Sequence, residues 1–254
     1  MRTMDMKCAR LYAKLPVYAK RLGETKRIIN DIMPQLEKPY LGFSCGKDSS
    51  VVAHLLLSLG YNIKMRFLSS GETRLLHNVD TIIDWFGQLG ADIEEINIDR
   101  VFSDDWKHAS WVEQKTAGRD DMKNHLSSGD WDGVIMGLRA DESRARKITL
   151  SCHRTDDLPR HCYRYKSGLV RVCPIGSWCN QDVAAYIQEH QIPVLNAYKE
   201  KGIGSRTTAR LTGDALRQGA LVELRERNPV GYQKLISRFP ELSAFANLDR
   251  VLPG

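Results

Sequence analysis

A short apolar run that stops at a cluster of small and charged residues constrains this 254-residue chain more than any other feature. Residues 39–43 predict a buried parallel strand, and the apolar run from Val51 to Leu59 predicts a helix that ends at Gly60. Between them lies the sequence Ser-Cys-Gly-Lys-Asp-Ser-Ser, residues 44–50. Such a loop directs backbone N–H groups and the positive end of the helix dipole to one point, so we expect an anion there.

The side chains of this loop suit a phosphate. Gly46 permits a tight turn, and Lys47 adds a cation that can follow charge on a leaving group. Asp48 is expected to cap the helix or to hold Mg2+ through water. Hydroxyl donors come from three serines, Ser44, Ser49 and Ser50. The Walker A pattern needs a second glycine ahead of its lysine, so a P-loop kinase or GTPase is not favoured.

The alternation of strand and helix continues beyond the loop. Further strands are predicted at 63–68, 93–98 and 133–136, and helices at 8–33 (one or two), 75–89, 181–190 and 214–245, the last interrupted by Pro229 and Pro240. This rhythm predicts an α/β fold with a parallel sheet sandwiched by helices. Residues 150–172 show no clear periodicity, and we expect chemistry or a mobile loop there instead of core.

Three segments are predicted from this pattern. They are an N-terminal helical segment (1–38), a nucleotide-binding α/β domain (39–200) and a C-terminal helical extension (201–254). Residues 202–213 form a basic, hydroxyl-rich stretch for which a lid over phosphates, a grip on nucleic acid and a simple linker are equally open.

Charge and composition indicate the setting. The net charge of +6 and pI near 9.0 favour polyanionic partners, nucleotides and nucleic acids among them. The N-terminal residues lack the apolar run of a signal peptide, and no stretch approaches the roughly 18 apolar residues of a membrane span, so a cytoplasmic protein with no membrane association is expected. Six cysteines without an export signal are interpreted as reduced thiols.

Three motifs resemble those of one protein family. Residues 43–50 resemble the Ser-Gly-Gly-Lys-Asp-Ser loop of PP-loop ATP pyrophosphatases, with Cys45 where the first glycine usually stands. Residues 137–143 are similar to the Gly-x-Arg-x-x-Glu-Ser element of the phosphoadenosine phosphosulfate (PAPS) reductase branch, which also contains the small subunit of ATP sulfurylase. Residues 174–187 are similar to that branch's Pro-Ile-x-x-Trp-x-x-x-Asp-Val-x-x-Tyr-Ile stretch. The motifs follow the family's order over about residues 40–195.

The resemblance is to the PAPS reductase-like family of PP-loop ATP pyrophosphatases, within the adenine nucleotide alpha hydrolase-like superfamily. It implies a Rossmann-type (PP-loop/HUP-like) sheet, with ATP, an adenylyl-sulfate or PAPS bound at the strand carboxyl ends together with Mg2+. It places four residues beside the phosphates: Gly137, Arg139, Glu142 and Ser143. The guanidinium of Arg139 could contact a phosphate bidentately, and an Arg139–Glu142 ion pair is the alternative. Adenosine contacts are implied for Ser70 and Gly71, although the family's aspartate is missing from this turn.

The cysteines leave two alternatives open. Cys152, Cys162, Cys173 and Cys179 lack the close Cys-x-x-Cys spacing of zinc or iron–sulfur ligands, so a metal or cluster, completed by His153 or His161, is not favoured. Cys45 lies at a predicted helix N-terminus, which lowers a thiol pKa. It is interpreted as a small residue filling a tight turn, with a sulfur carrier as the alternative.

The chain departs from true reductases in its cysteines. Those enzymes carry a reactive cysteine near the C-terminus in a Glu-Cys-Gly-x-His motif, and here no cysteine follows Cys179. Adenylation of an acceptor in sulfur transfer is therefore favoured, with Lys47, Asp48 and Arg139 as catalytic residues. A PAPS or adenylyl-sulfate reductase and a non-catalytic binding module are the alternatives. The expected partners are an adenine nucleotide, nucleic acid, a cysteine desulfurase or other sulfur-transfer protein, and further copies of the chain in a homo-oligomer. Whether the acceptor is sulfate, tRNA, DNA or protein stays open.

Overall fold

A computed structural model describes residues 3–98, 108–127, 129–152, 157–205, 211, 213–217 and 219–246. Its contacts divide the chain into two compact units. The first comprises residues 1–67, 80–95 and 129–205, and the second comprises residues 68–79, 96–128 and 206–254. Within the described residues, no helix is long and apolar enough to cross a membrane. The predicted segment boundaries at residues 38 and 200 stay predictions.

The sheet has six strands in the order β3-β2-β1-β4-β6-β5. Their bounds are β1 Pro39–Phe43, β2 Lys64–Ser69, β3 Ile93–Asn97, β4 Gly133–Ile135, β5 Cys162–Arg164 and β6 Val170–Val172. β1 pairs in parallel with β2 and β4, β4 pairs in parallel with β6, and β5 is antiparallel to β6. The predicted α/β fold is thereby confirmed, with all four predicted strands (39–43, 63–68, 93–98 and 133–136) at or near their expected positions.

The interpretation of residues 150–172 as an irregular stretch was wrong. α7 spans Arg144–Cys152, and β5 and β6 add an antiparallel hairpin to the edge of the sheet. Three-residue strands are too short to show the two-residue alternation on which the prediction depended. Val170, Val172 and Cys162 nevertheless point into the core and are almost completely buried.

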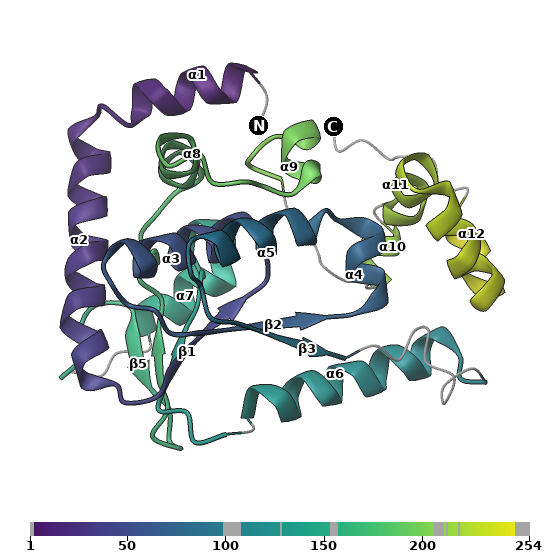
Figure 1. Cartoon of the computed structure of the whole chain (residues 1–254), viewed down its shortest axis with the longest axis horizontal. Coiled ribbons are helices and arrows are strands. Elements are labelled where there is room, and N and C mark those ends of the chain that lie inside the picture. Colours follow the sequence, from purple (N-terminus) through teal and green to yellow (C-terminus); the bar gives the residue numbers. More distant parts are fainter. Residues whose placement is uncertain are drawn as a thin grey trace. The chain divides into compact units, whose positions relative to one another are not determined.

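Helices α3 (Lys47–Ser58) and α5 (Val79–Gln88) run beside the strands of the first unit (Figure 1). The single helix expected over 75–89 is instead two short helices, α4 (Gly71–Leu76) and α5, because His77 and Asn78 leave the helical path between them. The ring of Phe43 in β1 packs edge-on against those of Phe67 and Phe86, at centroid distances of 6.4 and 5.3 Å. This apolar contact fixes β1, and with it the start of the loop that follows.

Two N-terminal helices, α1 (Thr3–Tyr12) and α2 (Pro16–Ile32), are followed by the short 3-10 turn η1 (Met33–Gln35). α1 packs on α8 (Asn180–Glu189), as Figure 1 shows, and side chains of α2 donate hydrogen bonds to α8. Arg21 lies 2.7 Å from the buried carboxylate of Asp182, and the indole of Trp178 donates to the Thr25 hydroxyl at 2.8 Å. α9 (Asn196–Lys201) follows α8 in the same unit.

The second unit has an apolar core of its own. Its helices are α4, α6 (Trp111–Ser127), α10 (Gly213–Arg217), α11 (Ala220–Arg227), α12 (Pro229–Arg238) and the 3-10 helix η4 (Pro240–Phe245). α11 and α12 pack together, and Leu221, Leu224 and Leu235 are fully buried between them and their neighbours. The predicted helical tail is confirmed, whereas α6 was not predicted.

Candidate functional site

The loop between β1 and α3 is closed by its own serines. The main-chain N–H of Ser44 donates to the Ser49 hydroxyl at 3.2 Å, and the two hydroxyl oxygens lie 3.0 Å apart. The Ser49 hydroxyl also donates at 3.0 Å to the carbonyl of Gly46, the N-cap residue of α3. The hydroxyl of Ser50 is buried and has no hydrogen-bond partner among the described residues. Serine hydroxyls and main-chain groups of the loop thus surround the N-terminus of α3, a twelve-residue helix.

Cys45 adopts a left-handed backbone conformation in this turn, with φ at +55°. Glycine adopts such a conformation without steric cost, whereas an L residue pays roughly 1 kcal/mol. The side chain is 1% exposed. The position therefore demands a small residue in a strained turn, which supports the interpretation of Cys45 as a turn-filling residue.

Lys47 and Asp48 begin α3 and face each other. The Lys47 ammonium lies 3.1 Å from Oδ2 of Asp48, and the two side chains are only 6% and 14% exposed. The same ammonium lies 5.1 Å from the ring centroid of Tyr198 in α9. The buried cation is therefore held between a carboxylate and an aromatic face.

Arg139 is buried, with 2% of its side chain exposed, and it reaches the same carboxylate. Its Nε lies 2.7 Å from Oδ1 of Asp48, but neither atom makes a hydrogen bond to a described residue, so the contact is an ion pair with a poorly aligned N–H. The other side of the guanidinium donates to Oδ1 of Asn180 at 2.9 Å and to the Trp178 carbonyl at 3.4 Å. Asp48 therefore joins two cations, Lys47 and Arg139, at the start of one helix.

The backbone of Gly137 presses directly on this loop. A Cβ built there would lie 2.7 Å from the Asp48 carbonyl carbon and 2.7 Å from the Ser49 nitrogen. No real Cβ contact is that short, so only glycine fits. The close approach explains in physical terms why the motif at residues 137–143 begins with glycine.

Glu142 supports Arg139 through the main chain, and Ser143 contacts Arg146. The Glu142 carboxylate accepts from the Arg139 main-chain N–H at 3.0 Å and forms a short ion pair with Arg146. The Ser143 hydroxyl accepts from the main-chain N–H of Arg146 at 3.2 Å. The structure thus brings the residues of both motifs together: Ser44, Cys45, Gly46, Lys47, Asp48, Ser49, Ser50, Gly137, Arg139, Glu142 and Ser143.

Ser70 and Gly71 belong to the second unit. Ser70 is the N-cap of α4, and its hydroxyl lies 3.1 Å from that of Thr73 in a reciprocal cap. This arrangement accounts for the serine as a helix-capping residue. Their contact with an adenosine stays a prediction.

Asn180 and Tyr198 were not predicted. Asn180 lies 41 residues from Arg139 in sequence, at an unspecified position within the family-like stretch 174–187, so only that motif could have drawn attention to it. Tyr198 carries no such signal. Both are identified by tertiary contacts alone.

Buried thiols elsewhere in the first unit are protonated. Burial raises the pKa of Cys162 to about 12 and that of Cys173 to about 11. Cys179 is the N-cap of α8, and its sulfur lies 3.4 Å from Nη1 of Arg21. In the part of the chain that the structure describes, no three His, Cys, Asp or Glu side chains are grouped to hold a metal. The side chain of Cys152 and all of His153 lie outside the described residues.

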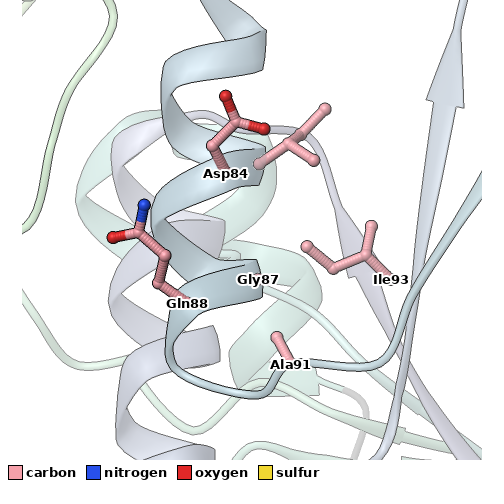
Figure 2. Close-up of a pocket in the computed structure, with 6 residues that line it drawn as sticks. Asp84, Gly87, Gln88, Ala91 and Ile93 are labelled. Atoms are coloured by element: carbon pink, nitrogen blue, oxygen red, sulfur yellow. The ribbon is translucent and has the colours of Figure 1, made fainter.

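An open depression beside α5 is separate from the loop. Figure 2 shows Asp84 and Gln88 projecting from the helix, with Ile93 beyond them. Its lining is completed by Ile83, Gly87 and Ala91. It contains none of the predicted site residues, and its few polar groups do not form a recognisable catalytic set.

Known proteins resemble this chain over most of its length. The family model of the phosphoadenosine phosphosulfate reductase domain matches residues 38–210. The sulfate adenylyltransferase subunit 2 of Burkholderia lata is 30% identical over 80% of this chain and 77% of its own length. The protein of the same name from Sulfurovum sp. is 29% identical over 70% of this chain and 66% of its own length. Among solved structures, the PAPS reductase from Candida auris, in a phosphate complex, has a TM-score of 0.49 at 15% identity, covering 72% of this chain and 86% of that one.

Proposed function

This chain belongs to the phosphoadenosine phosphosulfate reductase domain family, and on that premise we propose that it is an ATP pyrophosphatase of the adenylyltransferase type. It activates an acceptor by adenylation in sulfur transfer or sulfur assimilation. One observation carries the proposal: two buried cations, Lys47 and Arg139, share the carboxylate of Asp48 at the N-terminus of α3. The names of the relatives, sulfate adenylyltransferase subunit 2, support the reaction type.

The residues fit a triphosphate. The N–H groups at the start of α3, the buried Ser50 hydroxyl and the Lys47 ammonium are all donors, and an anion would satisfy them together. Asp48 holds both cations in place before the nucleotide arrives. Phosphate oxygens would then take over the contacts of Lys47 and Arg139, because a polyphosphate carries more negative charge than one carboxylate.

The proposed chemistry is a displacement at the α-phosphorus. An acceptor oxygen forms a bond to the α-phosphorus, and the bond from this phosphorus to the oxygen that bridges it to the β-phosphorus breaks. Pyrophosphate leaves with the electron pair of that bond. Lys47 and the α3 N–H groups stabilise the departing charge, and Arg139 holds the α-phosphate with its planar fork.

Mg2+ would enter with the nucleotide. In the described state both oxygens of Asp48 face cations, at 2.7 and 3.1 Å, so this carboxylate fits Mg2+ only after Lys47 and Arg139 have turned to the phosphates. When bound, the ion supplies charge neutralisation for the triphosphate.

The cytoplasmic setting and the partners also remain part of the proposal. Relatives named as a subunit 2 support a two-component enzyme, with a further protein that completes the reaction. A cysteine desulfurase or other sulfur-transfer protein would serve that role if the acceptor is thiolated, and a homo-oligomer stays a prediction.

The test is pyrophosphate release from ATP and Mg2+, measured with sulfate, tRNA or single-stranded DNA as acceptor. We expect Lys47→Ala to lower kcat by at least 100-fold, with a smaller loss of affinity for α,β-methylene-ATP, because the lysine acts most on the departing charge. The matched control is Lys64→Ala, which removes a half-exposed lysine paired with Asp92. Binding of the analogue without any pyrophosphate release would favour a binding module, and thiol-dependent sulfite release from adenylyl-sulfate would favour a reductase.

A further inference from the structure

The net positive charge of the chain is concentrated in one segment. Residues 143–181 contain eight of the 37 Lys and Arg residues and two of the 31 Asp and Glu residues. The remainder of the chain therefore carries 29 of each and is neutral. From residue 158 to residue 181 there is no acidic residue at all. Such segregation differs from the mixed charges of an ordinary solvated surface.

This segment folds into α7 and the β5–β6 hairpin of the first unit. Five of its cations are exposed and form what we call the basic strip: Arg144, Lys147, Arg160, Arg164 and Lys166. Arg164 pairs with Asp157 at 3.7 Å, and the two side chains are 45% and 67% exposed, so water screens the pair. The exposed cations of the basic strip can contact a partner at the surface.

The segments that flank the helix and the hairpin lie close to each other. The main-chain N–H of Ala140, just before α7, donates to the Gly176 carbonyl at 2.9 Å, just after β6. The positive charges of Arg146 and Arg171 both act to lower the pKa of Cys173, which directly follows β6. Arg146 of α7 and Arg171 of the hairpin are therefore both near Cys173 in the first unit.

Aromatic rings accompany these cations. Tyr163 and Tyr165 lie 4.9 Å apart in an edge-on pair, and the buried guanidinium of Arg171 lies 5.3 and 5.7 Å from their centroids. Tyr165 is 36% exposed at the start of the hairpin turn. The contact with buried Arg171 restrains both rings, and the exposed part of Tyr165 can stack on a base.

We propose that the basic strip and Tyr165 bind single-stranded nucleic acid. A segment in which cations outnumber acids eight to two matches a phosphate backbone. An exposed ring matches an unstacked base, which a duplex or an acidic protein does not offer. α7 begins two residues after Glu142, which supports Arg139, so the bound strand would start beside the phosphate loop. That the strand is also the acceptor rests on the proposed adenylation; the binding itself does not.

The charge contribution is tested by fluorescence anisotropy with a labelled oligothymidine, without ATP. The variant is Arg160→Gln/Arg164→Gln/Lys166→Gln, and the control is Lys20→Gln/Lys26→Gln/Arg27→Gln, which removes three exposed cations from α2 and gives the same net charge. Each phosphate contact contributes about 0.7 to the slope of log K against log salt, so the hairpin variant should lose about 2 from that slope. The control should keep the wild-type slope.

The stacking contribution is tested on the same oligonucleotide. Tyr165→Ala should weaken binding about tenfold and Tyr165→Phe should not, because phenylalanine keeps the ring. Circular dichroism at each variant checks the fold. The proposal is overturned if the control triple variant loses as much affinity as the hairpin variant, if a duplex or poly-glutamate binds as tightly as the single strand, or if Tyr165→Ala binds like wild type. Oligonucleotide binding without pyrophosphate release would overturn the adenylation proposal alone.

Discussion

Gly137→Ala tests the contact between the two motifs. The added Cβ would lie 2.7 Å from the backbone of Asp48 and of Ser49, and neither contact is to a flexible side chain. Ordinary contact begins at 3.4 Å, so the start of α3 must retreat by about 0.7 Å. Overpacking of this kind costs about 1–3 kcal/mol of stability.

The effect on activity should exceed the effect on stability. Lys47 and Asp48 lie in the displaced turn, and a misplacement of catalytic groups approaching 1 Å lowers rates about 100-fold. We therefore expect Gly137→Ala to fold, to unfold at a lower urea midpoint, and to release pyrophosphate about 100-fold more slowly than wild type.

The matched control is Gly42→Ala in β1. Its Cβ would meet only the Ile135 carbonyl oxygen at 3.8 Å, which is ordinary contact, so both stability and pyrophosphate release should stay near wild type. Equal rates for wild type and Gly137→Ala would refute the reasoning, as would an equal loss in Gly42→Ala.

Three further predictions concern other parts of the molecule. Cys45→Gly relieves a left-handed φ but loses a buried side chain, so the free energy of unfolding should change by less than about 1 kcal/mol and pyrophosphate release should persist; complete loss of release would contradict its interpretation as a turn-filling residue. Burial, with the charge of His190, lowers the pKa of His54 to about 4, so the folded state binds fewer protons than the unfolded state below about pH 6.5 and stability falls as the pH drops toward 4. The free energy of unfolding from urea titrations at pH 7.5 and 5 should therefore differ by about 1 kcal/mol less in His54→Gln than in wild type, and an equal pH dependence would contradict the assignment. Leu235→Ala in the core of the second unit should cost about 2–5 kcal/mol by thermal or urea unfolding, and a cost under about 1 kcal/mol would show that this core packs loosely.

Local signals account for what the sequence predicted. The strand, loop and helix from residue 39 to residue 58 lie next to one another, and each carries its own pattern, an apolar run, a small-residue cluster and a second apolar run. The loop residues therefore needed no tertiary information. The motif from Gly137 to Ser143 could be placed beside them only through the family resemblance.

Where local signals were weak, the prediction failed. α6 contains few apolar residues in its seventeen, and β5 and β6 are only three residues long, with Tyr and Arg at positions where an apolar residue would have revealed a strand. Asn180 and Tyr198 reach Arg139 and Lys47 across the fold, so their contacts depend on packing that no local pattern encodes. Asp48 was expected to cap a helix or hold a metal ion, and its pairing with two cations likewise depends on packing.

The most direct test of the central claim is the fate of label from [α-32P]ATP in the presence of Mg2+ and an acceptor. The account predicts that the label appears in AMP or in an adenylated acceptor and that the released pyrophosphate is unlabelled. Lys47→Ala should lower the rate at least 100-fold. Label in ADP, with release of inorganic phosphate, would place the cleavage at the γ-phosphate and contradict the account.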